Sequence, residues 1–307
     1  MISQTIAAYD LLDNAMVTGE TVKEALIDLG EQNISVETIK GKTRSTDFIR
    51  ILVPGSEGKR SGGKAPTLGI IGRLGGIGIR PRLPGLVSDS EGAIVSVTCA
   101  MKLADMIRKG DRLTGDVIIS THFCSNASTK LNNGVEFMEA PLDSCTMSLV
   151  ERITEADAVV SIDTTKGNRI INHLGFAITP TVKEGYILPV SKDLVTIMQV
   201  VTGKPAVVMP ISIPDITPYG NGLPHINSIM QPATVTDAPV AGVAITTEEV
   251  VPGSATGSTH IVELEKAARF VIEVAKLFGK EEIEFYDSNE YSVLLKLYGS
   301  MKRFQTK

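Results

Sequence analysis

The chain has 307 residues, 43% of them hydrophobic, which is enough for one large core or for one core with a small appendage. Its formal net charge is −5, and it has no long block of Lys and Arg of the kind that neutralises phosphates, so a nucleic-acid partner is not expected. No apolar run approaches the ~20 residues that span a bilayer, and Met1–Asn14 lacks the basic start of a signal peptide. Three cysteines fit neither a disulfide framework nor a zinc knuckle. These features predict a cytoplasmic protein without a membrane partner.

The apolar patterning predicts helices and strands in a regular order along the chain. Two short helices come first, and Thr18 or Glu20 could cap the second of them. A pair of strands follows, and from Thr67 onward short apolar strands alternate with helices. The predicted helices are Thr5–Met16, Thr21–Leu29, Ala93–Arg108, Leu142–Ile153, Leu194–Val201 and Ile261–Phe278. The predicted strands are Val36–Lys40, Thr46–Val53, Thr67–Ile71, Asp116–Ser120, Ala158–Ile162, Ala206–Ile211 and Val240–Ile245.

This alternation is typical of an α/β fold with three layers. Short strands that are apolar throughout indicate a mostly parallel central sheet with helices on both faces. We expect one domain over residues 1–307, with residues 1–44 as an N-terminal extension of helices and strand.

In such sheets, ligands bind beyond the carboxyl ends of the strands. His122 and Asp163 each follow a predicted strand, and Asp215 and His225 lie in the segment after another. Each also has a structural interpretation: a histidine after a strand is often simply hydrogen-bonded, and an aspartate there can form an Asx turn. His260 stands at the start of the last helix, where a histidine gains nothing from the helix dipole, which favours a ligand role.

Two further segments have competing interpretations. Asp89 and Glu91, in the sequence SDSEG before a long helix, could cap the helix and favour its dipole, or could point carboxylates into a site. The glycine-rich stretch Gly69–Gly78 lacks the GKS/T ending of a P-loop, so it is a poor candidate for phosphate binding.

Three stretches, taken in order, resemble the co-catalytic zinc exopeptidases, that is, the aminopeptidases and carboxypeptidases that share one α/β fold. The first is PGLVSDSEGAIVSVTCAMKLADMIRKGDRLTGDVIIS, the second ADAVVSID and the third GVAITTEEVVPGSATGSTHIVELEKAARFVIEVAKLF. The resemblance runs over roughly residues 45 to 280. The whole chain also resembles a bacterial family of unknown function.

The resemblance implies a metal site and a hydrolytic activity. Asp89 would be the bridging ligand, with Asp163 and His260 as terminal ligands of zinc or manganese. The sequence departs from the family twice: Arg73 stands where the first histidine is expected, and His122 stands where a pair of glutamates is expected. His122 could complete a rebuilt metal site, and Arg73 could bind a carboxylate of the substrate.

A rebuilt site of this kind also needs a base to deprotonate the attacking water. Glu91 or Asp215 could act as this base, and His225 could contact the substrate or add a ligand to the metal. The predicted function is a divergent metal-dependent hydrolase of C–N bonds in a small amide or peptide, with no nucleic-acid or membrane partner and with a homo-oligomer left open. The alternatives are an inactive member of the fold that binds a small molecule or assembles with partners, and a metal-free enzyme that uses Cys124 with His122.

Overall fold

The computed structural model describes residues 1–14, 16–41, 44–73, 86–125, 127–132, 135–139, 141–211, 227–249 and 259–305. The main sheet of this part of the chain has nine strands, in the order β1-β2-β4-β3-β7-β11-β9-β10, with β8 paired to β11. These strands are β1 (Ile34–Lys40), β2 (Ser45–Val53), β3 (Leu68–Gly72), β4 (Val117–Phe123), β7 (Ala158–Thr164), β8 (Gly175–Ile178), β9 (Val182–Lys183), β10 (Tyr186–Ile187) and β11 (Val240–Thr246). A separate hairpin pairs β5 (Ser128–Asn132) with β6 (Val135–Glu139).

The middle of the main sheet is parallel. β4, β3, β7 and β11 run in one direction, while β1, β2, β8, β9 and β10 add antiparallel pairs at the two sides. The parallel strands are buried along almost their whole length, because helices cover both faces. The predicted α/β class, with a mostly parallel sheet between helices, is therefore confirmed.

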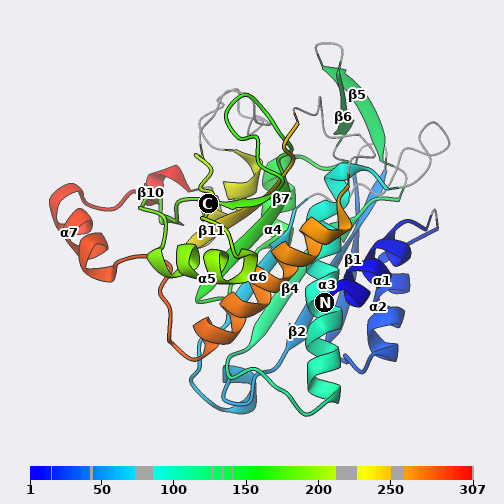
Figure 1. Ribbon diagram of the computed structural model, residues 1–307, viewed down its shortest axis with the longest axis horizontal. Coiled ribbons are helices and arrows are strands. Elements are labelled where there is room, and N and C mark those ends of the chain that lie inside the picture. Colours follow the sequence, from blue (N-terminus) through cyan, green and yellow to red (C-terminus); the bar gives the residue numbers. More distant parts are fainter. Residues whose placement is uncertain are drawn as a thin grey trace.

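The helices divide between the two faces of the sheet. One face carries α1 (Ile2–Leu12), α2 (Gly19–Asp28), α3 (Glu91–Arg108), α5 (Lys192–Thr202) and α6 (Ile261–Gly279), and α3 and α6 cross in front of the sheet in Figure 1. The other face carries α4 (Ser144–Glu151) and the 3-10 helix η3 (Ser228–Thr234). The remaining 3-10 helices are η1 (Lys59–Ser61), η2 (Ser88–Ser90) and η4 (Lys302–Phe304).

Alternate strand residues supply the two cores, as the two-residue period of a strand requires. Ile70 and Val160 belong to the core under α3 and α6. Their neighbours Ile71 and Val159 belong to the smaller core that includes Met230 of η3. The strands between the two cores are thus held in place from both sides.

Several element boundaries follow local chemistry. The Thr18 hydroxyl accepts a hydrogen bond from the Thr21 amide and caps α2, as predicted. Asp143 caps α4 in the same way, and Ser191 caps α5. No helix among the described residues is long and apolar enough to cross a membrane.

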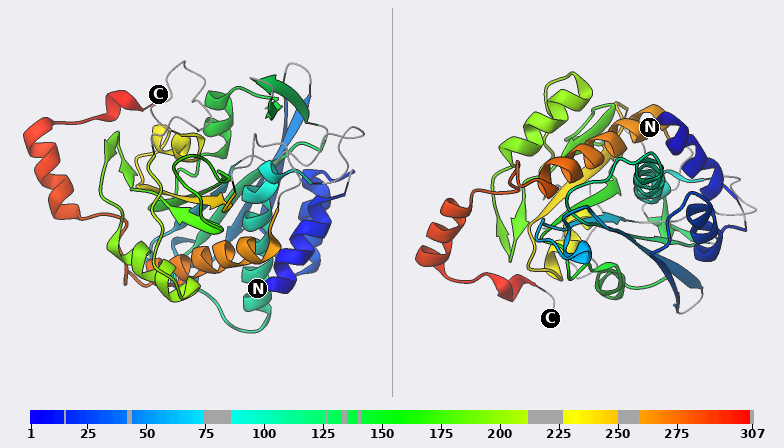
Figure 2. Two further views of the ribbon diagram at one scale, coloured as in Figure 1. Left: turned by 45° about the horizontal axis from the view of Figure 1, so that its top comes forward. Right: turned by 90° about the horizontal axis from the view of Figure 1, so that it is seen from below.

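Three expectations about the elements were wrong or incomplete. Ala206–Ile211 is not a strand: only Val208 forms an isolated bridge, to Ile178. β4 continues past Ser120 to Phe123, so His122 lies inside the strand and not after it. α7 (Ser288–Tyr298) was also not predicted; it lies at one end of the molecule (Figures 1 and 2) and packs on β10 of the sheet through Tyr291 and Tyr186.

A close approach at Gly92 fixes the start of α3 against the sheet. A Cβ atom at Gly92 would lie 2.4 Å from the Arg73 carbonyl oxygen and 2.7 Å from that of Ile162. Only glycine allows this contact. It brings the first turn of α3, including Glu91, directly onto the carboxyl ends of β3 and β7.

Candidate functional site

A group of buried charged side chains lies at the carboxyl ends of β3, β4 and β7. Arg73 directly follows β3, and its amide donates to the Ile162 carbonyl of β7 over 2.8 Å. His122 lies near the end of β4, and Asp163 is the penultimate residue of β7. These side chains are at most 3% exposed. The structure thus brings three of the predicted site residues to one edge of the sheet.

Glu151, the last residue of α4, joins two of these side chains. Its Oε2 accepts from Arg73 Nη1 at 2.6 Å, and its Oε1 lies 2.6 Å from His122 Nδ1. Burial opposes ionisation of Glu151, but the Arg73 guanidinium and the bonded His122 together hold its pKa below the usual value. Because Glu151 is therefore ionised and can only accept, His122 carries a proton on Nδ1.

Arg73 also connects the cluster to η3. Its Nη2 donates to the side chain of Gln231 over 2.6 Å, and its Nη1 lies 3.4 Å from the Ser148 hydroxyl. Because both Nη atoms form hydrogen bonds and the side chain is buried, the main role of Arg73 in the structure is to hold Glu151 and Gln231 in place. Its Nε has no hydrogen-bond partner, and the predicted binding of a substrate carboxylate by Arg73 stays a prediction.

Asp163 is held by two donors and has an altered acidity. Its Oδ2 accepts from the Ser228 hydroxyl at 2.7 Å, and its Oδ1 accepts from the Thr164 amide at 2.8 Å. Burial raises its pKa to about 6, against the opposing effect of the nearby Arg73 charge. A carboxyl group with such a pKa can exchange a proton near neutral pH.

Glu91 and Lys166 form a second buried ion pair at the same edge. Lys166 lies two residues beyond β7, and its Nζ is 2.5 Å from Glu91 Oε1. Burial raises the pKa of Glu91, although Lys166 and the neighbouring hydroxyls of Thr164 and Thr259 favour its charged form. Since Glu91 neutralises Lys166, the structure gives it an ion-pair role, and the predicted role as base stays a prediction.

The other predicted residues are placed differently. Asp89 is buried in η2 next to this edge and does not cap α3, whose N-cap is Ser90. His260 is the N-cap of α6 and its side chain is exposed, although Thr259 just before it lies by Glu91. Asp215 and His225 lie outside the described residues.

Among the described residues, the contacts at this edge of the sheet do not fit the predicted metal site. Both carboxylate oxygens of Glu151 are bonded to Arg73 and His122, and Glu91 is paired with Lys166. His260 points to solvent. In the described ranges, no group of three His, Cys, Asp or Glu side chains is arranged to hold a metal ion. The four-ligand set of Asp89, His122, Asp163 and His260 is not assembled by the described residues alone and stays a prediction.

Sequence reasoning missed four members of the cluster: Glu151, Lys166, Gln231 and Ser228. A signal existed for one of them. Glu151 lies one helical turn after the buried Met147 and Ser148, so a glutamate occupies the inward face of α4. Lys166 and the two residues of η3 have no comparable pattern, because their roles depend on contacts with distant segments.

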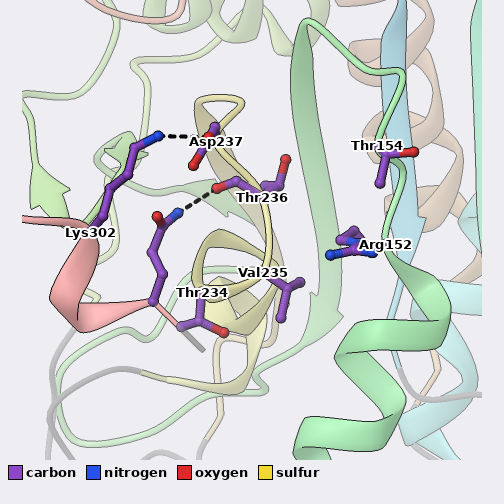
Figure 3. Close-up of a pocket in the computed structure, with 8 residues that line it drawn as sticks. Arg152, Thr154, Thr234, Val235, Thr236, Asp237 and Lys302 are labelled. Atoms are coloured by element: carbon purple, nitrogen blue, oxygen red, sulfur yellow. Dashed lines mark hydrogen bonds and ion pairs between the residues drawn. The ribbon is translucent and has the colours of Figure 1, made fainter. Parts of the chain in front are cut away.

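A groove of about 420 Å³ lies between the end of α4 and the C-terminal segment (Figure 3). Arg152, the neighbour of Glu151, lines one side, and the C-terminal segment lines the other. In that segment Lys302 binds Asp237, and Gln305 donates to the Thr236 carbonyl. The groove contains no residue of the charged cluster, so it is not the candidate site.

Several solved structures have a fold similar to that of this chain. The bottromycin maturation enzyme BotP is 14% identical and aligns over 88% of this chain and 69% of its own, with a TM-score of 0.51. The LapA aminopeptidase of Legionella pneumophila is 12% identical, over 94% and 72%, with a TM-score of 0.51. An M17 aminopeptidase of Trypanosoma brucei is 12% identical, over 87% of this chain and 61% of its own, with a TM-score of 0.50.

The chain thus has the fold of the exopeptidases, as the sequence resemblance predicted. A second structure of BotP is a complex with manganese. The chain belongs to the family of proteins of unknown function designated DUF1177, whose model matches residues 37–307. A comparison with curated proteins finds no match.

Proposed function

We propose that this protein is a peptidase-like hydrolase that cleaves a C–N bond in a small amide or peptide. The observation that carries the proposal is the His122–Glu151 pair beside Asp163, buried at the carboxyl ends of parallel strands on an exopeptidase fold. Ligands bind at this edge of open α/β sheets. Buried titratable groups with altered acidity mark functional sites more often than other positions.

In the proposed step, His122 is the base. Glu151 accepts from Nδ1–H, so the tautomer with a basic Nε2 is favoured, and Nε2 can take a proton from the attacking water. Asp163 is the acid that returns a proton to the leaving nitrogen. Arg73 is a positioning residue, because it holds Glu151 against His122.

Zinc or manganese does not enter this step. A metal-dependent version would need ligands beyond the described residues, such as Asp215 and His225. The expectation was that Glu91 or Asp215 is the base. His122 takes this role in the proposal, because Glu91 is the direct partner of Lys166 and Asp215 lies outside the described residues.

The test is turnover by untagged protein of dipeptides and amino-acid amides, followed by mass spectrometry of the released amine. We expect His122→Gln to lower kcat by about 100-fold or more, the usual effect of removing a general base. His173→Gln, at a half-buried histidine that belongs to neither site, is the matched control. His260→Gln separates the two site arrangements: it abolishes activity if His260 binds a catalytic metal and has little effect if His122 and Asp163 act alone.

A second candidate is a small-molecule-binding protein without catalysis. It is favoured by one observation, namely that Glu151 is bonded by both Arg73 and His122 inside the cluster. Calorimetric binding of the same compounds without any product from wild-type protein would support this candidate and refute the hydrolase.

A further inference from the structure

Two buried side-chain cations lie at the sheet edge where the exopeptidase resemblance predicts a metal ion. Arg73 follows β3, and Lys166 follows β7, the parallel neighbour of β3. Each residue is 2% exposed. Buried charges of this kind are kept in folded proteins only when other groups compensate them.

Each cation has a buried carboxylate partner among the described residues. Arg73 pairs with Glu151 at 2.6 Å, and Lys166 pairs with Glu91 at 2.5 Å. Both glutamates are fully buried. The positive charge that a divalent ion would bring to these carboxylates is therefore already present in the chain, and a divalent ion near Asp163 would be repelled by the Arg73 charge.

The backbone fixes the position of Lys166. The backbone φ of Lys166 is +52°, in the left-handed region that residues other than glycine rarely adopt. Its amide donates to the Ile245 carbonyl over 3.0 Å. At the next residue, Gly167, a Cβ atom would lie 2.1 Å from the Glu249 carbonyl oxygen. Such backbone strain persists only where the surrounding structure imposes it, so the fold places this lysine at the site.

We infer that Arg73 and Lys166 are resident cations, which supply from the chain itself the positive charge that metal ions supply in the zinc exopeptidases. The protein then folds and binds its substrate without a divalent metal. The inference extends the proposed hydrolase function, and only its statement about substrate binding rests on that proposed function. The compensation of Glu91 and Glu151 holds whether or not turnover occurs.

The test compares metal content and thermal unfolding in untagged wild-type protein and in Lys166→Met. Wild type should contain far less than one equivalent of zinc or manganese by elemental analysis, and neither EDTA nor added Mn²⁺ should shift its melting temperature. Lys166→Met leaves Glu91 buried without its cation, so its melting temperature should fall and should rise again with Mn²⁺. Lys109→Met is the matched control, because it removes an exposed lysine paired with Asp105 and should show no response to Mn²⁺.

A double variant protects the test against a trivial loss of folding. Glu91→Gln combined with Lys166→Met removes both charges, so its melting temperature should lie above that of Lys166→Met and should not respond to Mn²⁺. Stoichiometric metal in wild type, with a melting temperature that EDTA lowers, would overturn the inference, as would a Lys166→Met variant that Mn²⁺ does not stabilise. Failure of the proposed hydrolase function gives a different result. If the protein is metal-free and insensitive to EDTA but turns over no amide, the inference about Arg73 and Lys166 still holds and the hydrolase activity is refuted.

Discussion

Glu151→Gln is the substitution that most directly probes the buried cluster. The glutamine keeps the size of the side chain, and its Oε1 can still accept from Arg73. The amide nitrogen then faces His122, which can present an unprotonated Nδ1 and accept. What is lost is the charge, since Glu151 is the carboxylate that contacts both Arg73 and His122 at 2.6 Å.

The expected loss of stability is about 3 kcal/mol, the lower end of the range for removing one partner of a buried ion pair. This would be a large fraction of the ~5–15 kcal/mol that stabilises a typical domain. Urea denaturation followed by circular dichroism, with wild type and variant fitted to the same slope, measures the difference.

Glu155→Gln is the control for this experiment. Glu155 bonds Arg50 at 2.7 Å, a distance close to that of the buried pair, but both side chains are partly exposed. An exposed pair contributes ~1 kcal/mol or less. If Glu151→Gln destabilises the protein no more than Glu155→Gln, the cluster is not the compensated buried network described here.

Two further predictions concern Asp163 and Gly92. Because the folded-state pKa of Asp163 is raised to about 6, its contribution to stability is fully present below its ordinary pKa and is lost as the pH rises through 6. The free energy of unfolding of Asp163→Asn, relative to that of wild type, should therefore rise by about 2 kcal/mol between pH 4 and pH 8 in urea denaturation, from about 1.4 kcal/mol per pKa unit, and a difference that does not change with pH would contradict the assignment. Gly92→Ala should lower the melting temperature strongly, because its Cβ would lie 2.4 Å from the backbone oxygen of Arg73; a melt equal to that of wild type would show that α3 does not press on the strand ends.

The fold could be predicted from the sequence because its signals are local. The continuous apolar runs of the parallel strands and the apolar stripes of α3 and α6 are visible within windows of a few residues. The error at Ala206–Ile211 has a physical reason. An apolar run of that length fits a buried strand, but here it packs beside β8 and against the core without forming a ladder, so tertiary contacts decided the outcome.

The site was predicted only in part. Asp163 and His122 were found because the carboxyl ends of parallel strands meet at one edge. Arg73 was also expected there, but the sequence could not show that Glu151, 78 positions away, would occupy its guanidinium. Lys166 carries no motif at all, and its pairing with Glu91 exists only in three dimensions.

The most direct test of the central claim is anomalous diffraction from crystals of untagged protein soaked in excess zinc. We expect no anomalous peak in the cluster formed by Arg73, Glu151, His122 and Asp163, because Arg73 already compensates Glu151 and its charge repels a divalent ion near Asp163. A peak at zinc-ligand distance, about 2.0–2.2 Å, from Asp163 or His122 would contradict it.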